Sequence, residues 1–276
     1  MATSDLAAVF DAIGPDIGPV TPQLWGPVGQ SLIFALQLRP GAAVLDVCSG
    51  AGASALPAAA AVGPTGRVHA VDLADDLLEQ GRLIASDRAL QNIDFVCADV
   101  TTWEPPSDVP AAGYDALACS FGVFFLPHMD FDVVRLLRLV ADGGRVGVSV
   151  WRSGALAEFT DAFYEVIGRH RPNTVRRSRH DAARLDTTDK LTAWLDGLGV
   201  TSVAVFELSN LIPATDEFAW NLVLGSGFRS AMADMPPAEV EAVRTELLTL
   251  LIDRGLHTID ASALIGTGVV RREMTD

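Results

Sequence analysis

The fold is decided by residues 43–52, which read AVLDVCSGAG. The first five form an apolar, partly β-branched run, which predicts a buried strand. The glycines that follow allow a sharp turn and a close approach of the backbone to a ligand, and an alanine-rich helix is expected next. A strand, a glycine loop and the free N–H groups of a helix start form a typical nucleotide site. An ordinary strand-to-helix turn would look the same, so the loop needs support from elsewhere in the chain.

Strands and helices alternate beyond this stretch. Strand-like runs follow at residues 68–72, 93–99, 115–120 and 145–151, and helical patterns between them include residues 75–88 and 132–140. Asp142, Gly143 and Gly144 are expected to stop the second of these helices and to turn into the strand at 145. The alternation predicts an α/β, Rossmann-like fold, in which a mostly parallel sheet carries helices on both faces.

The C-terminal half departs from this alternation. Helices are expected at residues 155–170 and 188–198, a strand at 200–208, a helical stretch at 213–255 and a last strand at 263–270. That helical stretch is far longer than an ordinary connection. We therefore expect one domain over residues 1–276, with its core at about 39–208 and 263–276 and cap elements at 1–38 and 209–262.

Charge and cysteine content narrow the functional classes. The net charge is −15, whereas binding to nucleic acid or to an anionic membrane needs a basic surface. Neither is expected as a partner. No apolar run approaches the ~18 residues of a membrane span, and no basic segment opens the chain, so we expect a cytoplasmic protein. Cys48, Cys97 and Cys119 stand in apolar surroundings and are expected to be buried, reduced thiols.

Two acidic residues support a nucleotide site. Asp72 ends the second expected strand, 20 residues after Gly52, where a carboxylate can accept hydrogen bonds from ribose hydroxyls. A helix N-cap is the alternative for Asp72. Asp99 ends the third strand, where it could accept a hydrogen bond from an adenine amino group. Because parallel strands end at one edge of a sheet, these acids and the glycine loop are expected to lie together.

The same segments resemble one family. Residues 44–52, 71–73, 95–100, 114–117 and 136–145 are similar, in order and spacing, to the motifs of class I S-adenosylmethionine-dependent methyltransferases. The similarity is to the subgroup of ubiquinone/menaquinone-biosynthesis methyltransferases. It implies S-adenosyl-L-methionine as cofactor and a seven-stranded sheet whose last strand is antiparallel, which suits the expected strand at 263–270.

The resemblance also implies the cofactor contacts. Asp46 would lie under the methionine end, Asp72 would hold the ribose, and Asp99 would meet the adenine. The remaining contacts are implied for the loop and for neighbours of these acids: Cys48, Ser49, Gly50, Gly52, Leu73, Val100 and Ser120. Cys48 replaces the family's first loop glycine. Since a nicotinamide fold would need glycines at positions 48, 50 and 53, Cys48 and Ala53 disfavour an NAD(P)-dependent oxidoreductase.

Methyl transfer is an in-line displacement that mainly needs an aligned acceptor and exclusion of water. A hydroxyl or acidic carbon acceptor also gains from a general base. His128 follows the fourth strand and is the candidate base, because histidine titrates near neutrality; a surface role at a helix start is the alternative. Phe124, Phe125 and Trp151 are expected to wall an apolar acceptor pocket.

Two later segments are further candidates for binding the acceptor. Arg176 and Arg177 belong to a basic loop that could engage a carboxylate or phosphate, or could simply be solvated. Trp220 belongs to the helical cap, which covers the substrate in the resembled family; a helix-bundle core or a homodimer contact is the alternative. No histidine pair or carboxylate cluster has metal-ligand spacing, so no metal is expected.

The sequence therefore predicts methylation of a small, partly apolar acceptor on oxygen, nitrogen or carbon, with S-adenosylmethionine as donor. Because a fold does not determine chemistry, a second hypothesis is a relative that binds the cofactor without transferring its methyl group, as a cyclase or a binding protein.

Overall fold

A computed structural model describes residues 3–172 and 180–272. Its main sheet contains β1 (Ala43–Val47), β2 (Arg67–Asp72), β3 (Ile93–Cys97), β4 (Tyr114–Ser120), β5 (Val140–Trp151), β6 (Val200–Leu208) and β9 (Ala263–Val270). The strand order is β3-β2-β1-β4-β5-β9-β6. Strands β1 to β5 pair in parallel, whereas β9 is antiparallel to both β5 and β6. The predicted fold with an antiparallel last strand is confirmed.

Helices cover both faces of this sheet, because alternate strand residues point to opposite sides. On one face, α3 (Trp25–Leu36) and α4 (Ala55–Val62) pack over Val44, while α5 (Asp75–Asp87) packs against β3. On the other face, α6 (Met129–Leu137) shares an apolar cluster with Leu45 and Val47, and α9 (Thr188–Gly197) packs against β6 and β9.

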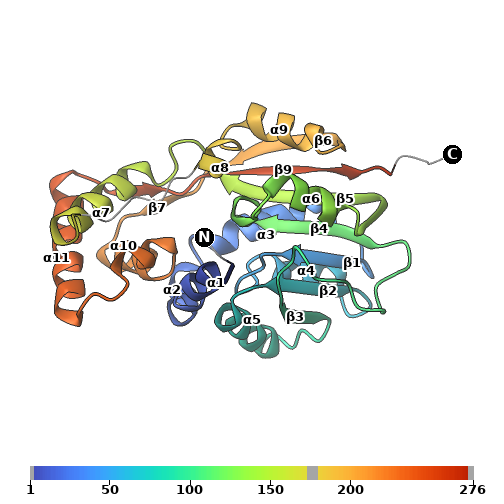
Figure 1. Ribbon diagram of the computed structural model, residues 1–276, viewed down its shortest axis with the longest axis horizontal. Coiled ribbons are helices and arrows are strands. Elements are labelled where there is room, and N and C mark those ends of the chain that lie inside the picture. The colour runs from blue at the N-terminus through green and yellow to red at the C-terminus, as the bar shows by residue number, and fades with distance from the viewer. Residues whose placement is uncertain (1–2, 173–179, 273–276) are drawn as a thin grey trace.

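A helical cap lies beyond the carboxyl ends of the parallel strands, on the left in Figure 1. Three helices, α7 (Ala157–His170), α10 (Asp216–Leu224) and α11 (Pro237–Asp253), share an apolar cluster with α2 (Ile17–Val20). The shorter elements are α1 (Thr3–Asp11), η1 (Gly14–Asp16), η2 (Val123–Phe125), α8 (His180–Ala183), η3 (Gly227–Met232), β7 (Leu211–Pro213) and β8 (Thr258–Asp260). The small β7–β8 sheet was not predicted, because three-residue strands show no measurable period.

The turn predicted at Asp142-Gly143-Gly144 is wrong. These residues lie inside β5, which begins at Val140 opposite Tyr114. The register with β4 shifts directly after this pair, and Gly143 has a φ of +77°. A left-handed glycine in an irregular ladder is typical of a bulge. The glycines therefore bend a strand that has already started.

The cysteines differ from one another in exposure. Cys119 is buried as predicted, whereas Cys97 is exposed and Cys48 is only partly buried. Cys97 ends β3, which is the edge strand of the sheet and has a neighbour on one side only. The prediction of three buried thiols is therefore wrong for Cys97, because apolar flanks do not reveal which strand lies at the edge.

Candidate active site at the carboxyl edge of the sheet

The glycine loop is fastened to the end of the second strand. Gly50 and Gly52 have φ angles of +52° and +83°, in the left-handed region that favours glycine. The Gly50 N–H donates to Asp72 Oδ2 at 2.8 Å, and the Ala74 N–H donates to Asp72 Oδ1 at 2.9 Å. Burial raises the pKa of Asp72 despite these donors. The structure thus brings Asp72 against the loop, as predicted, and its side chain does not cap α5.

Asp46 is completely buried beneath the same loop. Its Oδ2 accepts a 2.7 Å hydrogen bond from Ser54 Oγ, whereas its Oδ1 and the buried Ser49 Oγ have no partner in the described part of the chain. Burial, and secondarily the charge of Asp72, raises the pKa of Asp46 to about 7. A buried carboxylate oxygen without a donor is unfavourable. The site therefore suits a ligand that brings an N–H or cationic group.

Asp99 follows β3 and forms a tight turn. Its Oδ1 accepts from the Thr101 N–H at 2.9 Å and from Thr101 Oγ1 at 2.7 Å. Beside it, Val100 is buried, and Leu73 at the end of β2 is half-buried. At the end of β4, the Ser120 hydroxyl is 2.9 Å from that of Ser149. The acids that end or follow β1, β2 and β3 thus lie along one edge of the sheet, as the parallel topology requires.

Cys48 takes a left-handed conformation, with a φ of +54°, at the position of the family's first loop glycine. Its thiol is hydrogen-bonded to Cys119, and this contact and burial raise its pKa. Gly122 makes the space for this pair: a Cβ on Gly122 would lie 2.4 Å from Cys48 Cβ and 2.7 Å from Cys119 Sγ. The larger residue at position 48 is accommodated by a glycine on the facing loop.

Aromatic side chains from separate segments meet next to this loop. Phe121 stacks on Trp151 with ring centroids 4.2 Å apart, and Trp25 packs at 5.5 Å from Phe121 and 5.7 Å from Trp151. Phe124 and Phe125 pack together at 4.9 Å, and Phe10 of α1 packs edge-on against Phe125 at 5.1 Å. Neither Trp25 nor Phe121 was among the site residues predicted from the sequence. The only local signal for Trp25 was an aromatic residue within the segment 1–38, which was predicted to be a cap element.

The other predicted site residues are His128, Trp220, Arg176 and Arg177. His128 is exposed at the N-cap of α6, and its backbone N–H donates to Asp132 Oδ2 at 2.8 Å. Trp220 packs, half-buried, against the apolar cluster of the cap. Arg176 and Arg177 lie outside the described residues. Within residues 3–172 and 180–272, no three His, Cys, Asp or Glu side chains are grouped to hold a metal ion, and no helix is long and apolar enough to span a membrane.

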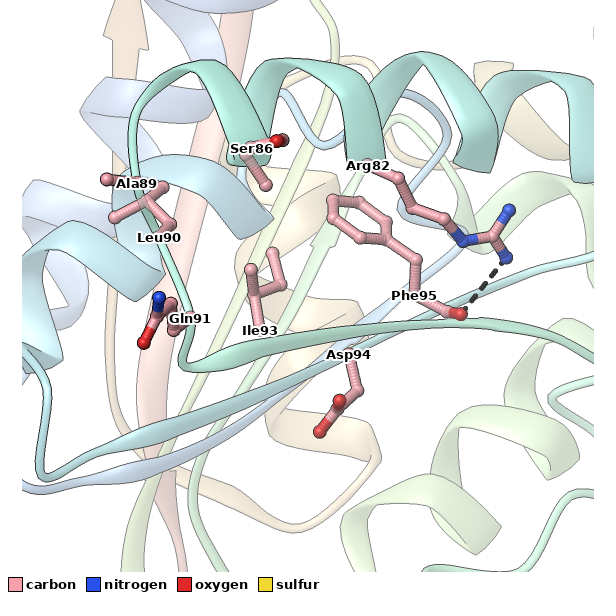
Figure 2. A pocket seen from close by; sticks show the side chains of 9 residues that line it. Arg82, Ser86, Ala89, Leu90, Gln91, Ile93, Asp94 and Phe95 are labelled. Atoms are coloured by element: carbon pink, nitrogen blue, oxygen red, sulfur yellow. Dashed lines mark hydrogen bonds between the residues drawn. The ribbon is translucent and has the colours of Figure 1, made fainter.

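A surface hollow of about 560 Å³ lies away from these residues. Figure 2 shows it between the C-terminal half of α5 and the edge strand β3, where Arg82 donates to the Phe95 carbonyl at 3.2 Å. None of the predicted site residues lines it. It opens beside the sheet edge formed by β3, whereas a cofactor in this topology binds beyond the carboxyl ends of the strands.

The sheet order, the glycine loop and the acids at the strand ends define a Rossmann-like methyltransferase. Residues 28–168 match the ubiE/COQ5 methyltransferase family, and the chain belongs to this family. It is an S-adenosylmethionine-dependent methyltransferase. Family membership agrees with the resemblance seen in the sequence and sets aside the oxidoreductase alternative.

Named relatives support this assignment, and a solved structure shares the fold. The aklanonic acid methyltransferase DauC of Streptomyces sp. (strain C5) is 30% identical over 186 residues, which are 64% of this chain and 83% of that protein. The nocamycin O-methyltransferase of Saccharothrix syringae is 30% identical over 149 residues, 54% of this chain and 49% of that one. The crystal structure of the [4+2]-cyclase SpnF shares the fold, with a TM-score of 0.59, 15% identity and coverage of 99% of this chain and 98% of that chain.

Proposed function

We propose that the carboxyl edge of the sheet binds S-adenosylmethionine and transfers its methyl group to oxygen or carbon of a small, partly apolar acceptor held under the cap. The observation that carries this proposal is the buried Asp46 carboxylate with its unpartnered Oδ1. The names of the two curated relatives support the class of acceptor and reaction. Because the chain has a net charge of −15, we propose a small molecule and not a nucleic acid as the acceptor. A homodimer, a cytoplasmic location and the single-domain boundaries stay predictions.

In this proposal each part of the edge has its own task. Bound S-adenosylmethionine supplies an electrophilic methyl group. Asp46 would accept from the donor's amino group, Asp72 from the ribose and Asp99 from the adenine. The remaining donor contacts are assigned to the neighbouring loop and strand-end residues: Cys48, Ser49, Gly50, Gly52, Leu73, Val100 and Ser120.

The acceptor side is apolar. Phe124, Phe125 and Trp151 would exclude water from the transfer, which favours an in-line displacement. From the cap, Trp220 would cover the acceptor, and Arg176 and Arg177 would meet an anionic substituent. His128 would remove the acceptor's proton at the start of α6; its exposure requires the acceptor to extend towards it.

Calorimetry of S-adenosylmethionine binding tests the proposal. Wild type is expected to bind, and Asp46→Leu, which fills the buried site without a carboxylate, is expected to bind at least tenfold more weakly. Asp87→Asn, at an exposed acid that ends α5, is the matched control and should bind as wild type does. A wild-type chain that does not bind the donor would refute the proposal. Tight binding without S-adenosylhomocysteine formation, tested with a panel of phenols and enolic carbon acids, would favour the cyclase or binding-protein hypothesis.

A further inference from the structure

Three aromatic side chains at the carboxyl edge form one compact group, which we name the aromatic triad: Trp25, Phe121 and Trp151. They come from the first turn of α3, from the residue after β4 and from the last residue of β5. Their apolar cluster also contains Val28, Phe124, Leu208 and Ala263. Phe121 is buried, whereas Trp25 and Trp151 are each half-buried and keep part of their surface accessible. Such a surface suits an uncharged, flat ligand.

Phe121 is held in a conformation that bulky residues rarely adopt. Its φ is +56°, and non-glycine residues in this region are disfavoured and concentrate at functional sites. Its N–H donates to the Ser149 carbonyl at 3.0 Å, which holds the chain in place as it leaves β4. In this conformation the Phe121 ring stacks on Trp151 at 4.2 Å, with 30° between the ring planes. The unfavourable backbone conformation of Phe121 therefore occurs where its ring forms part of an aromatic surface next to the glycine loop.

Trp25 adds an unused hydrogen-bond donor to this surface. Its Nε1 is shielded from water and has no hydrogen-bond partner among the described residues. An indole N–H can only donate, and leaving such a donor unsatisfied in an apolar site is unfavourable. A ligand oxygen placed beside it would satisfy the donor. Because Nε1 is buried, entry of the ligand requires the half-buried Trp25 side chain to rotate.

We infer that the aromatic triad is the acceptor subsite, that it binds a planar aromatic or conjugated ring system by stacking, and that the Trp25 indole N–H donates to an uncharged carbonyl or phenol oxygen of that ring. The inference rests on the proposed function and specifies the class of acceptor. The oxygen is uncharged, because the side chains of the apolar cluster that holds the triad, among them Val28, Phe124 and Leu208, offer no charge to balance one. Trp25 is accordingly a specificity-determining residue that contacts the substrate.

Equilibrium dialysis with two flat probes tests the inference: 1,8-dihydroxyanthraquinone and the oxygen-free anthracene. Both are measured with S-adenosylhomocysteine present. Trp25→Phe keeps a ring but removes the N–H, so it should weaken binding of the dihydroxyanthraquinone by about five- to tenfold and leave anthracene binding unchanged. Trp151→Leu removes a stacking ring and should weaken both probes. Phe34→Leu, on the exposed face of the same helix as Trp25, is the matched control and should bind both probes as wild type does.

Two results would overturn the inference. One is dihydroxyanthraquinone binding that is as tight in Trp25→Phe as in wild type. The other is a wild-type chain that binds S-adenosylmethionine by calorimetry but neither probe. In both cases donor binding stays intact, so the failure concerns the acceptor subsite alone. A wild-type chain that does not bind the donor would instead refute the proposed function. Donor affinity equal to wild type in each variant shows that the fold has survived the substitution.

Discussion

The backbone N–H of Gly50 donates to the Asp72 carboxylate at 2.8 Å, across 22 residues of sequence. This contact joins the loop after β1 to the end of β2, so the residue proposed to hold the ribose also holds the loop. The other oxygen of Asp72 is occupied by the Ala74 N–H at 2.9 Å. One carboxylate therefore organises two turns at the carboxyl edge of the sheet.

Asp72→Asn is expected to weaken donor binding and to destabilise the loop. An amide has one acceptor oxygen, so either the Gly50 or the Ala74 N–H would face an NH₂ group. We expect the Kd for S-adenosylmethionine to rise at least tenfold and the free energy of unfolding to fall by about 1–3 kcal/mol. Calorimetry and urea denaturation measure the two effects, with Asp87→Asn as the exposed control. Donor affinity equal to wild type would show that Asp72 has no part in binding.

Gly29→Ala is expected to disturb the contact between α3 and the segment after the glycine loop. A Cβ on Gly29 would lie 2.1 Å from the Ala53 carbonyl oxygen and 2.5 Å from its carbon. Because both atoms belong to the backbone, a main-chain shift must relieve the clash, and we expect a loss of about 2 kcal/mol or more in the free energy of unfolding. Urea denaturation measures the loss. Gly168→Ala in α7, with no atom within 4 Å of the added Cβ, should leave stability equal or slightly raised. If the two variants lose the same free energy of unfolding, the close contact with Ala53 is not the reason for glycine at position 29.

Asp46 should make stability fall as pH rises. Burial raises its pKa in the folded chain from 3.8 to about 7. Between these values the folded chain retains a proton that the unfolded chain has released, so the stability lost to this group grows from about pH 4 and is complete above about pH 7. Asp46→Asn removes the effect. The variant should therefore be more stable than wild type. Its advantage in the free energy of unfolding should be larger at pH 8 than at pH 5 by an amount on the order of 3 kcal/mol. Urea titrations of both proteins at several pH values measure it, and a difference that does not vary with pH would contradict the assignment.

His128→Gln tests the proposed base. We expect kcat to fall about 100-fold and the affinity for S-adenosylmethionine to stay unchanged. The fold should survive, since the backbone of His128 makes its hydrogen bonds to Asp132: the N–H donates to Oδ2 and the carbonyl accepts from the Asp132 N–H. His257→Gln, at an exposed histidine before β8, is the control and should retain full turnover. Full turnover in His128→Gln would leave His128 with a surface role only.

Local patterns in the sequence determined most of the fold and the donor side of the candidate site. Apolar runs separated by glycine, proline and charge located each strand of the main sheet, because strand and turn preferences act between neighbours in the chain. Parallel topology then placed Asp46, Asp72 and Asp99 at one edge, since parallel strands all end on the same side. No long-range contact had to be known for this result.

Tertiary structure alone decided the acceptor side. Trp25, Phe121 and Trp151 are far apart in the sequence and meet because α3 packs over β4, β5 and β9. The exposure of Cys97 depends on β3 being the edge strand, and the early start of β5 depends on its pairing with Tyr114. Packing between distant segments has no counterpart in a local pattern. The sequence therefore located the edge of the sheet that we propose binds the methyl donor, while the contacts between separate elements determined which aromatic surface lies beside it.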